Sequence, residues 1–248
     1  MGSLRVGVYV DAFNLYYGGR ESCGRGTPGW RWLDIRALAT TLVSWRRDWA
    51  GALLDRVVYC TAQIDAANNP SGHADQDVYL KALLASGSVD HIELGYYVAR
   101  VKRGPLALAD GKGRPRVARA GWTGLVMPYD SLNTPMPDAS FLVSYATREE
   151  KGSDVNIASH LLTDTLRGEI DAAVVISNDS DLRYPIDQVR QIIPVGTVNP
   201  TPKQTAGALR GTRDDGVGRH WWIKLTAADF KNHQLPDPAG GYTRPSEW

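Results

Sequence analysis

Residues 174–182 have the sequence VVISNDSDL, and this stretch decides the fold class. The three β-branched apolar residues at 174–176 are typical of a buried strand. The strand ends abruptly in a polar segment that contains Asp179 and Asp181. Carboxylates directly after a buried strand stand at its carboxyl end, which is the edge where open α/β sheets place their functional sites. The stretch therefore predicts a parallel strand with an acidic tip.

The start of the chain repeats this pattern, because alternating apolar residues at 5–10 predict a strand and Asp11 follows it directly. Asp34 is suited to cap a helix, since apolar residues with helical spacing follow it. Further strands are predicted at 56–65, 91–99, 141–147, 172–176 and 193–200, and further helices at 75–86, 153–166 and 182–192. The alternation of strands and helices predicts an α/β fold with a mainly parallel central sheet flanked by helices.

Residues 100–140 break this alternation. The first twenty of them contain seven Lys or Arg and one Asp, a net charge of +6, whereas the whole chain carries +1. The sequence ADGKG at 109–113 suits a hairpin turn, and the Pro-rich residues 127–138 are expected to form a loop. We therefore expect one domain over residues 1–248, with a basic inserted hairpin or flap at about 100–140 and a loose tail at 237–248.

Composition limits the remaining classes. The chain has 248 residues, of which 43% are apolar, and this suffices for a sizeable core. The two cysteines, Cys23 and Cys60, are too few for a disulfide framework or a thiolate metal cage. No apolar stretch has the length of a membrane span, and the first residues do not resemble a signal peptide. These features predict a cytoplasmic protein with no membrane partner.

Four acidic residues are expected at the carboxyl edge of the sheet. Asp154 stands in the first turn of a predicted helix, near its packed face, and joins Asp11, Asp179 and Asp181. Clustered carboxylates raise one another's pKa values unless a cation lies among them. Oxygen ligands suit Mg²⁺ or Mn²⁺. Asp179 and Asp181 are equally suited to cap a helix or form a turn, and Asp154 suits the dipole at a helix start, whereas Asp11 is less easily explained as a turn residue. The hypothesis of a metal site therefore depends on all four together.

Four segments resemble the NYN-domain family of PIN-like metal-dependent nucleases. They are VGVYVDAFNLYYG (6–18), EKGSDVNIASHLLTD (150–164), VVISNDSDLRYPI (174–186) and HQLPDP (233–238). The matching segments occur in the family's order, span roughly residues 4–236 and leave out the basic insertion. The resemblance implies a Rossmann-like PIN/NYN fold and cleavage of RNA with Mg²⁺ or Mn²⁺.

The resemblance also implies roles for single residues. Asp11, Asp154, Asp179 and Asp181 match the family's acidic positions, as catalytic groups and metal ligands. Asn14 would orient a ligand or contact a phosphate, Ser177 would hydrogen-bond a carboxylate or phosphate, and Lys151 would stabilise phosphate charge. Two positions depart from the family: Asn178 stands where many members have Gly, and His160 where many have a further acid. Because of these departures, the number of metal ions, one or two, stays open. Three roles stay open for His160: a metal ligand, a phosphate contact or a surface histidine.

The predicted function is a metal-dependent (endo)ribonuclease, a hydrolase that uses metal-activated water to give 5′-phosphate and 3′-hydroxyl ends. Basic residues of the insertion would neutralise substrate phosphates: Arg100, Lys102, Arg103, Arg114 and Arg116, with Lys112 and Arg119. Tyr16, Tyr17 and Trp122 are candidates for base stacking. The expected partner is RNA, with single-stranded DNA as a further option, and self-association into a homo-oligomer is left open.

Two other classes compete with this hypothesis. The first is a non-catalytic RNA- or protein-binding module on the same fold; the full set of four acids argues against it, and the departures at Asn178 and His160 keep it open. The second is a different metal-dependent phosphoryl or glycosyl transferase that uses the Asp-Ser-Asp motif. A haloacid-dehalogenase-type phosphatase needs a second Asp where this chain has Phe13, and the phosphate-binding sequence Gly-x-x-x-x-Gly-Lys-Ser/Thr does not occur in the chain.

Overall fold

The computed structural model describes residues 3–122 and 124–248. The chain divides into two compact units. The first unit runs up to Tyr97 and resumes at Glu150, and the second unit comprises Val98–Glu149. The first unit contains the helices and most of the central sheet. The second contains the basic segment together with residues 98–105 and 142–149 of two strands.

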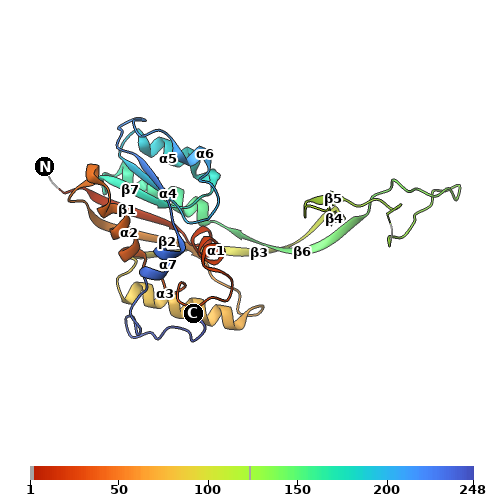
Figure 1. The fold of residues 1–248 in the computed structure, drawn as a ribbon, viewed down its shortest axis with the longest axis horizontal. Helices are drawn as coiled ribbons and strands as arrows, with labels where there is room; N and C mark the ends of the chain where they lie inside the picture. Colours follow the sequence, from red (N-terminus) through yellow and green to blue (C-terminus); the bar gives the residue numbers. More distant parts are fainter. Residues whose placement is uncertain (1–2, 123) are drawn as a thin grey trace. The chain divides into compact units, whose positions relative to one another are not determined.

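The sheet has seven strands in the order β6-β3-β2-β1-β7-β8-β9 (Figure 1). Neighbouring strands from β3 to β9 are parallel. At the edge, β6 runs antiparallel to β3, because Gly95 lies against the Lys151 carbonyl whereas Gly104 lies against Tyr145. The strand bounds are β1 (Arg5–Asp11), β2 (Leu53–Ala62), β3 (His91–Pro105), β6 (Leu142–Lys151), β7 (Ala172–Ile176), β8 (Val195–Asn199) and β9 (Trp221–Lys224).

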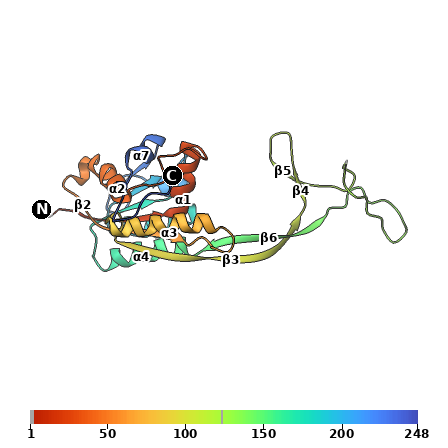
Figure 2. The same ribbon diagram turned by 90° about the horizontal axis from the view of Figure 1, so that it is seen from below.

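Helices cover both faces of this sheet, as the turned view in Figure 2 shows for α2 and α7 on one side and α4 on the other. Val8 of β1 belongs to the core beneath the first group of helices, whereas the next residue, Tyr9, belongs to the core beneath the second group. This alternation is the two-residue period of a strand. The first group comprises α1 (Ala12–Cys23), α2 (Ile35–Ser44), α3 (Pro70–Ala85) and α7 (Ala227–Asn232), and the second comprises α4 (Ser153–Leu166), α5 (Arg183–Arg190) and α6 (Gly207–Arg210). Two short 3₁₀ helices, η1 (Arg47–Trp49) and η2 (Ser180–Leu182), complete the elements of this unit.

The strand order reverses between β1 and β7. From β1 the chain proceeds to β2 and then β3 on one side, and later to β7 and then β8 on the other side. In open α/β sheets the carboxyl edge at such a reversal is where the loops separate and leave a crevice. Asp11 ends β1, and Ser177 follows the last residue of β7, so both lie at this point. The α/β class with a mostly parallel, helix-flanked sheet is therefore confirmed.

The buried face of α4 differs in part from the apolar stripe that its sequence predicts, which comprises Val155, Ala158, Leu161, Leu162 and Leu166. Leu161 is buried, and Ala158 and Leu162 pack against the same core, but Val155 and Leu166 are 67% and 73% exposed, whereas Asp164 is buried. Tyr9 donates its hydroxyl hydrogen to Asp164 Oδ2 at 2.8 Å, and Arg56 Nη1 lies 3.2 Å from Asp164 Oδ1. A buried carboxylate is tolerated when it is hydrogen-bonded and paired, and these contacts supply both. Apolar spacing alone therefore identified only the middle of this face.

The C-terminal segment packs against the first unit instead of forming a loose tail. Ala239 is fully buried, and Trp32 Nε1 donates a hydrogen bond to the Pro236 carbonyl at 2.9 Å. The ring of Trp248 lies 5.4 Å from that of Tyr79 and 6.3 Å from that of Trp32. Burial of a tryptophan stabilises a segment more than any other single side chain, so this one anchors the end of the chain.

The second unit contains the hairpin of β4 (Ala107–Ala109) and β5 (Pro115–Val117), which pair antiparallel. Asp110 organises the turn between them, because its Oδ1 accepts hydrogen bonds from the backbone of Lys112 at 2.8 Å and of Arg114 at 2.9 Å. This unit begins and ends outside the predicted insertion at 100–140. Across the described parts of both units, no helix combines the length and hydropathy needed to cross a membrane.

The buried contact between Tyr9 and Asp164 gives a test of the fold. The substitution Tyr9→Phe removes one donor to a buried carboxylate and should lower the free energy of unfolding by about 1–2 kcal/mol, measured by urea denaturation. Tyr145→Phe, at an exposed position, is the matched control and should leave stability unchanged. Equal stability of Tyr9→Phe and wild type would contradict the assigned packing of α4.

Candidate functional site

Asp11 is the centre of the acidic edge. Its carboxylate is 3% exposed and caps α1 by accepting a hydrogen bond from the Asn14 backbone at 3.0 Å. The other oxygen, Oδ2, accepts hydrogen bonds from Asn14 Nδ2 and Ser177 Oγ, each at 2.8 Å. Burial raises the pKa of Asp11, and these hydrogen bonds oppose the rise. The structure thus brings Asn14 and Ser177 to Asp11. The roles toward a ligand or phosphate that the resemblance implies for these two residues stay predictions.

The tip of β7 is joined to this network. The backbone N–H of Asp179 donates to Ser177 Oγ at 3.0 Å, and Asp179 in turn accepts from the backbone N–H of Asp181. Asn178 donates its backbone N–H to Asn14 Oδ1 at 3.2 Å. Its side-chain oxygen accepts from the Ala206 backbone at 2.8 Å, and its φ is not positive. Asn178 therefore holds neighbouring loops together and does not replace the left-handed Gly that the resemblance suggested.

Burial and the charges of the neighbouring acids raise the pKa of Asp154. Its pKa is raised to about 6, first by burial and then by the charges of Asp11, Asp179, Glu150 and Asp181. Gly152, with φ of +102°, starts α4 and directs Asp154 toward this edge. Lys151 is exposed at the end of β6. The four predicted acids therefore gather at one edge of the sheet.

The metal-binding role of these four acids stays a prediction. Within the described residues, the group of three candidate ligand atoms that all lie within 4.8 Å of one another is His91, Glu93 and His160. Both oxygens of Asp11 accept hydrogen bonds from protein donors. Asp11 and Asp179 therefore also have a structural role, because each caps the helix that follows it.

Seven aromatic side chains are among the residues that line a cavity of about 400 Å³ on the α1 and α3 side of the sheet. Within its wall, Phe13 stacks on Tyr17 with ring centroids 6.3 Å apart and meets the edge of Tyr97 at 6.1 Å. Burial raises the pKa of Tyr97 to about 12, so this phenol stays neutral. The lining is Phe13, Tyr16, Tyr17, Arg20, Arg31, Tyr59, Thr61, Ile64, Asn69, Gly72, Asp75, Gln76, Tyr79, Leu80, Tyr97 and Trp248. We call this cavity the aromatic pocket.

Two arginines give the aromatic pocket a cationic character. Arg20 lies over the Tyr17 ring, 5.8 Å from its centroid. Arg31 Nη1 donates to the Glu247 carbonyl at 3.0 Å, while its buried Nε finds no hydrogen-bond partner among the described residues. A pocket with aromatic walls and a few convergent charged groups suits a planar ligand that carries an anionic group. Tyr16 and Tyr17, predicted to stack on bases, belong to this pocket.

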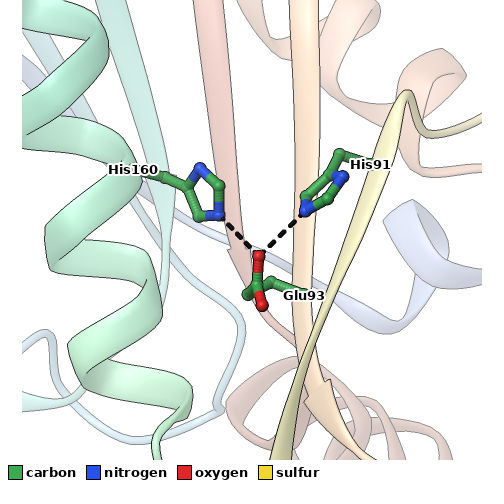
Figure 3. A group of neighbouring side chains, drawn as sticks. All are labelled: His91, Glu93 and His160. Atoms are coloured by element: carbon green, nitrogen blue, oxygen red, sulfur yellow. Dashed lines mark hydrogen bonds and ion pairs between the residues drawn. The ribbon is translucent and has the colours of Figure 1, made fainter.

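His160 does not lie isolated on a helix surface. Its Nε2 lies 3.0 Å from Glu93 Oε2, and its Nδ1 lies 3.4 Å from Arg56 Nη2 (Figure 3). His91 Nε2 lies 2.9 Å from the same oxygen of Glu93. Sequence reasoning missed His91 and Glu93. The signal was available, because residues two apart on a strand point to the same face.

The basic residues predicted to bind phosphates lie in the second unit. Arg100 and Arg103 are exposed on β3, and Lys102 forms an ion pair with Glu149. Arg114 pairs with Asp110 at 3.1 Å, and Arg116 lies over the Trp122 ring, 5.9 Å from its centroid. Contact of these residues with RNA stays a prediction.

Comparison with known proteins gives one curated relative. No family model matches the chain. The chain is 28% identical, over an alignment of 266 positions, to 6-hydroxy-3-succinoylpyridine 3-monooxygenase HspA of Pseudomonas putida. That alignment covers 99% of this chain and 75% of the relative. A crystal structure of a Vibrio parahaemolyticus protein of unknown function is similar with a TM-score of 0.43 and 13% identity, over 90% of this chain and 93% of the other.

This relative contradicts the predicted activity. A monooxygenase is an oxidoreductase, so the metal-dependent ribonuclease, its hydrolase chemistry and its Mg²⁺ or Mn²⁺ cofactor were wrong predictions. The acidic pattern suggested a nuclease, but acids at the carboxyl edge also have a structural use, because Asp11 and Asp179 serve there as helix caps. Acids at this edge follow from the fold, and a fold does not determine the chemistry.

The raised pKa of Asp154 predicts a dependence of stability on pH. The native pKa of about 6 exceeds the ordinary value of 3.8, so the folded protein holds this proton more tightly than the unfolded chain does. Stability should therefore fall as pH rises from about 4 to about 6. The substitution Asp154→Asn should raise the free energy of unfolding by about 1 kcal/mol near neutral pH, after allowance for partial exposure, and by much less near pH 4.

Urea denaturation of wild type and Asp154→Asn at both pH values measures this difference. Asp55→Asn, at an exposed position on β2, is the control and should show no such pH-dependent gain. A gain that is the same at both pH values would mean that charge repulsion at the acidic edge is not its cause.

Proposed function

We propose that this chain is an oxidoreductase that oxygenates a planar heteroaromatic compound with an acidic group, bound in the aromatic pocket. The observation that carries the proposal is the 28% identity, across 99% of this chain, to a protein named as a monooxygenase of 6-hydroxy-3-succinoylpyridine. That name describes a hydroxypyridine ring with a succinoyl side chain. The Rossmann-like PIN/NYN architecture, suggested by the sequence resemblance, would on this proposal be a scaffold for different chemistry.

The composition of the aromatic pocket supports this substrate class. Pyridine rings stack on aromatic side chains, and the lining includes the exposed rings of Tyr16 and Tyr17. A carboxylate on the substrate would pair with the guanidinium of Arg20 or Arg31. The volume of about 400 Å³ lies within the range of small-molecule sites, which is about 300–1,000 Å³.

Oxygenation requires a group that activates O₂, in proteins a flavin or a transition metal. The carboxyl edge of the sheet does not fit the diphosphate of a flavin dinucleotide. A flavin dinucleotide site has a glycine-rich turn between the first strand and the helix that follows it. Here β1 ends at Asp11 and α1 begins at the next residue, so there is no such turn between them. The four acids also make this edge negative. The spacing Gly-x-Gly-x-x-Gly occurs at residues 24–29, but this segment follows α1 and no helix begins at its end.

The proposal is tested by reductant-dependent turnover. One oxygen atom of O₂ enters the substrate, the other leaves as water, and two electrons come from a nicotinamide reductant that is added. The purified chain is incubated with 6-hydroxy-3-succinoylpyridine, and O₂ consumption and product mass are followed, with free flavins and Fe²⁺ each added in separate arms. A hydroxylated product in any arm supports the proposal. Absence of binding and of turnover in every arm would overturn it.

Arg20 gives a sharper test of the pocket. The substitution Arg20→Leu removes a charge-assisted contact and should weaken binding of a carboxylate-bearing hydroxypyridine about tenfold or more, measured by calorimetry. Binding of the corresponding uncharged amide should change little. Arg47→Leu, an exposed position outside the pocket, is the matched control. Equal loss of affinity for the acid and the amide would show that Arg20 does not contact the carboxylate.

A further inference from the structure

His91, Glu93 and His160 form a cluster whose polar atoms converge on one point (Figure 3). His91 and Glu93 are two residues apart at the start of β3, so their side chains share a face, and His160 reaches them from α4. We propose that these three side chains bind a divalent transition-metal ion. This proposal does not depend on the proposed oxygenation, and it concerns residues outside the aromatic pocket and the acidic edge.

The distances within the cluster suit a shared ion. The Nε2 atoms of His91 and His160 lie 2.9 Å and 3.0 Å from Glu93 Oε2. Ligand atoms that each lie about 2.0–2.2 Å from one metal ion are about 3 Å apart. The three ligand atoms already lie within 4.8 Å of one another, so a small rotation of the His91 ring completes the set.

The surroundings leave open positions on the ion. The side chains of His91, Glu93 and His160 are 44%, 37% and 21% exposed. Behind them, Cys60 of β2 pairs in register with Glu93 and is fully buried, which gives the cluster a rigid apolar floor. Three protein ligands with a solvent-accessible side are the arrangement of sites that accept water or a small ligand as well.

The donor set selects the class of metal. Two imidazoles and one carboxylate suit Fe²⁺, Zn²⁺ and neighbouring first-row ions, whereas Mg²⁺ prefers sites made of oxygen alone. The same set with open positions holds Fe²⁺ in non-haem oxygenases and Zn²⁺ in some hydrolases. The bound ion therefore has to be identified by analysis of the purified protein.

Arg56 is expected to lower the affinity of the proposed site for a metal ion. A ligating histidine usually donates its second N–H to an acceptor, which orients the ring. The atom facing His160 Nδ1 is Arg56 Nη2, at 3.4 Å, and a guanidinium can only donate. Arg56 also adds positive charge beside the ion. Gln at this position would offer an acceptor, whereas Met would offer none. Both variants lose the charge and the ion pair of Arg56 with Asp164, so the difference between them reports the acceptor alone.

The experiment measures metal content and affinity. Elemental analysis of the purified chain, and calorimetric titration of the chelator-treated chain with Zn²⁺, Co²⁺ and anaerobic Fe²⁺, should give one ion per chain, with much weaker binding of Mg²⁺. Loss of a partner that merely orients a ligand costs about 10–100-fold in affinity, so Glu93→Gln and His91→Gln should each cost at least about 100-fold. His73→Gln, on α3, is the matched control and should bind as wild type does.

Arg56→Gln should bind Zn²⁺ about tenfold more tightly than wild type, and more tightly than Arg56→Met. Circular dichroism of every variant checks that it is folded. Absence of saturable binding of all three transition metals by wild type would overturn the proposal, as would unchanged binding in both Glu93→Gln and His91→Gln. Because metal content is measured without substrate, failure here is distinct from failure of the oxygenation assay.

Discussion

The carboxylate of Asp11 is the group on which the centre of the molecule depends. It is buried at the point where the strand order reverses, and it accepts hydrogen bonds from α1 and from the residue after β7. These contacts join the two halves of the sheet at its carboxyl edge. A buried carboxylate is costly unless it is satisfied, so Asn14 and Ser177 are needed for the edge to form. The same hydrogen bonds give the acid at the tip of β1 a structural role in the fold.

The sheet separates the two regions to which chemistry is assigned. Tyr59 faces the aromatic pocket, whereas the next residue, Cys60, faces the core beneath α4, on the side of His160. Adjacent residues of a strand point to opposite faces, so the pocket and the His91, Glu93 and His160 cluster lie on opposite faces of the sheet. An ion in the cluster is therefore not positioned over a ligand in the pocket, and the two assignments stand or fall separately.

Local patterns in the sequence predicted much of the fold. The period-2 segment before Asp11 and the β-branched run before Asp179 identified β1 and β7 and the edge where the acids gather, because strand period and burial are local properties. The rotation of α4 was not predictable in this way, since Asp164 is buried by contacts with Tyr9 and Arg56 far away in the sequence. The packing of Trp248 on Tyr79 depends on tertiary structure in the same way.

The candidate sites were less accessible to sequence reasoning. Tyr17, Tyr79 and Trp248 of the aromatic pocket are widely separated along the chain, and so are His91 and His160. The acidic residues were found, but their number and order suggested a nuclease, because a carboxylate that caps a helix and one that binds a metal give the same sequence pattern. The finding that contradicts the nuclease is the relative named as a monooxygenase.

We propose that this chain transfers oxygen from O₂ and does not hydrolyse its substrate. The decisive measurement is turnover of 6-hydroxy-3-succinoylpyridine under ¹⁸O₂ in ordinary water, and in parallel under ordinary O₂ in H₂¹⁸O. Oxygenation should give a product with one labelled atom from ¹⁸O₂ and none by turnover from H₂¹⁸O. A product labelled only from water would mean that the chain is a hydrolase.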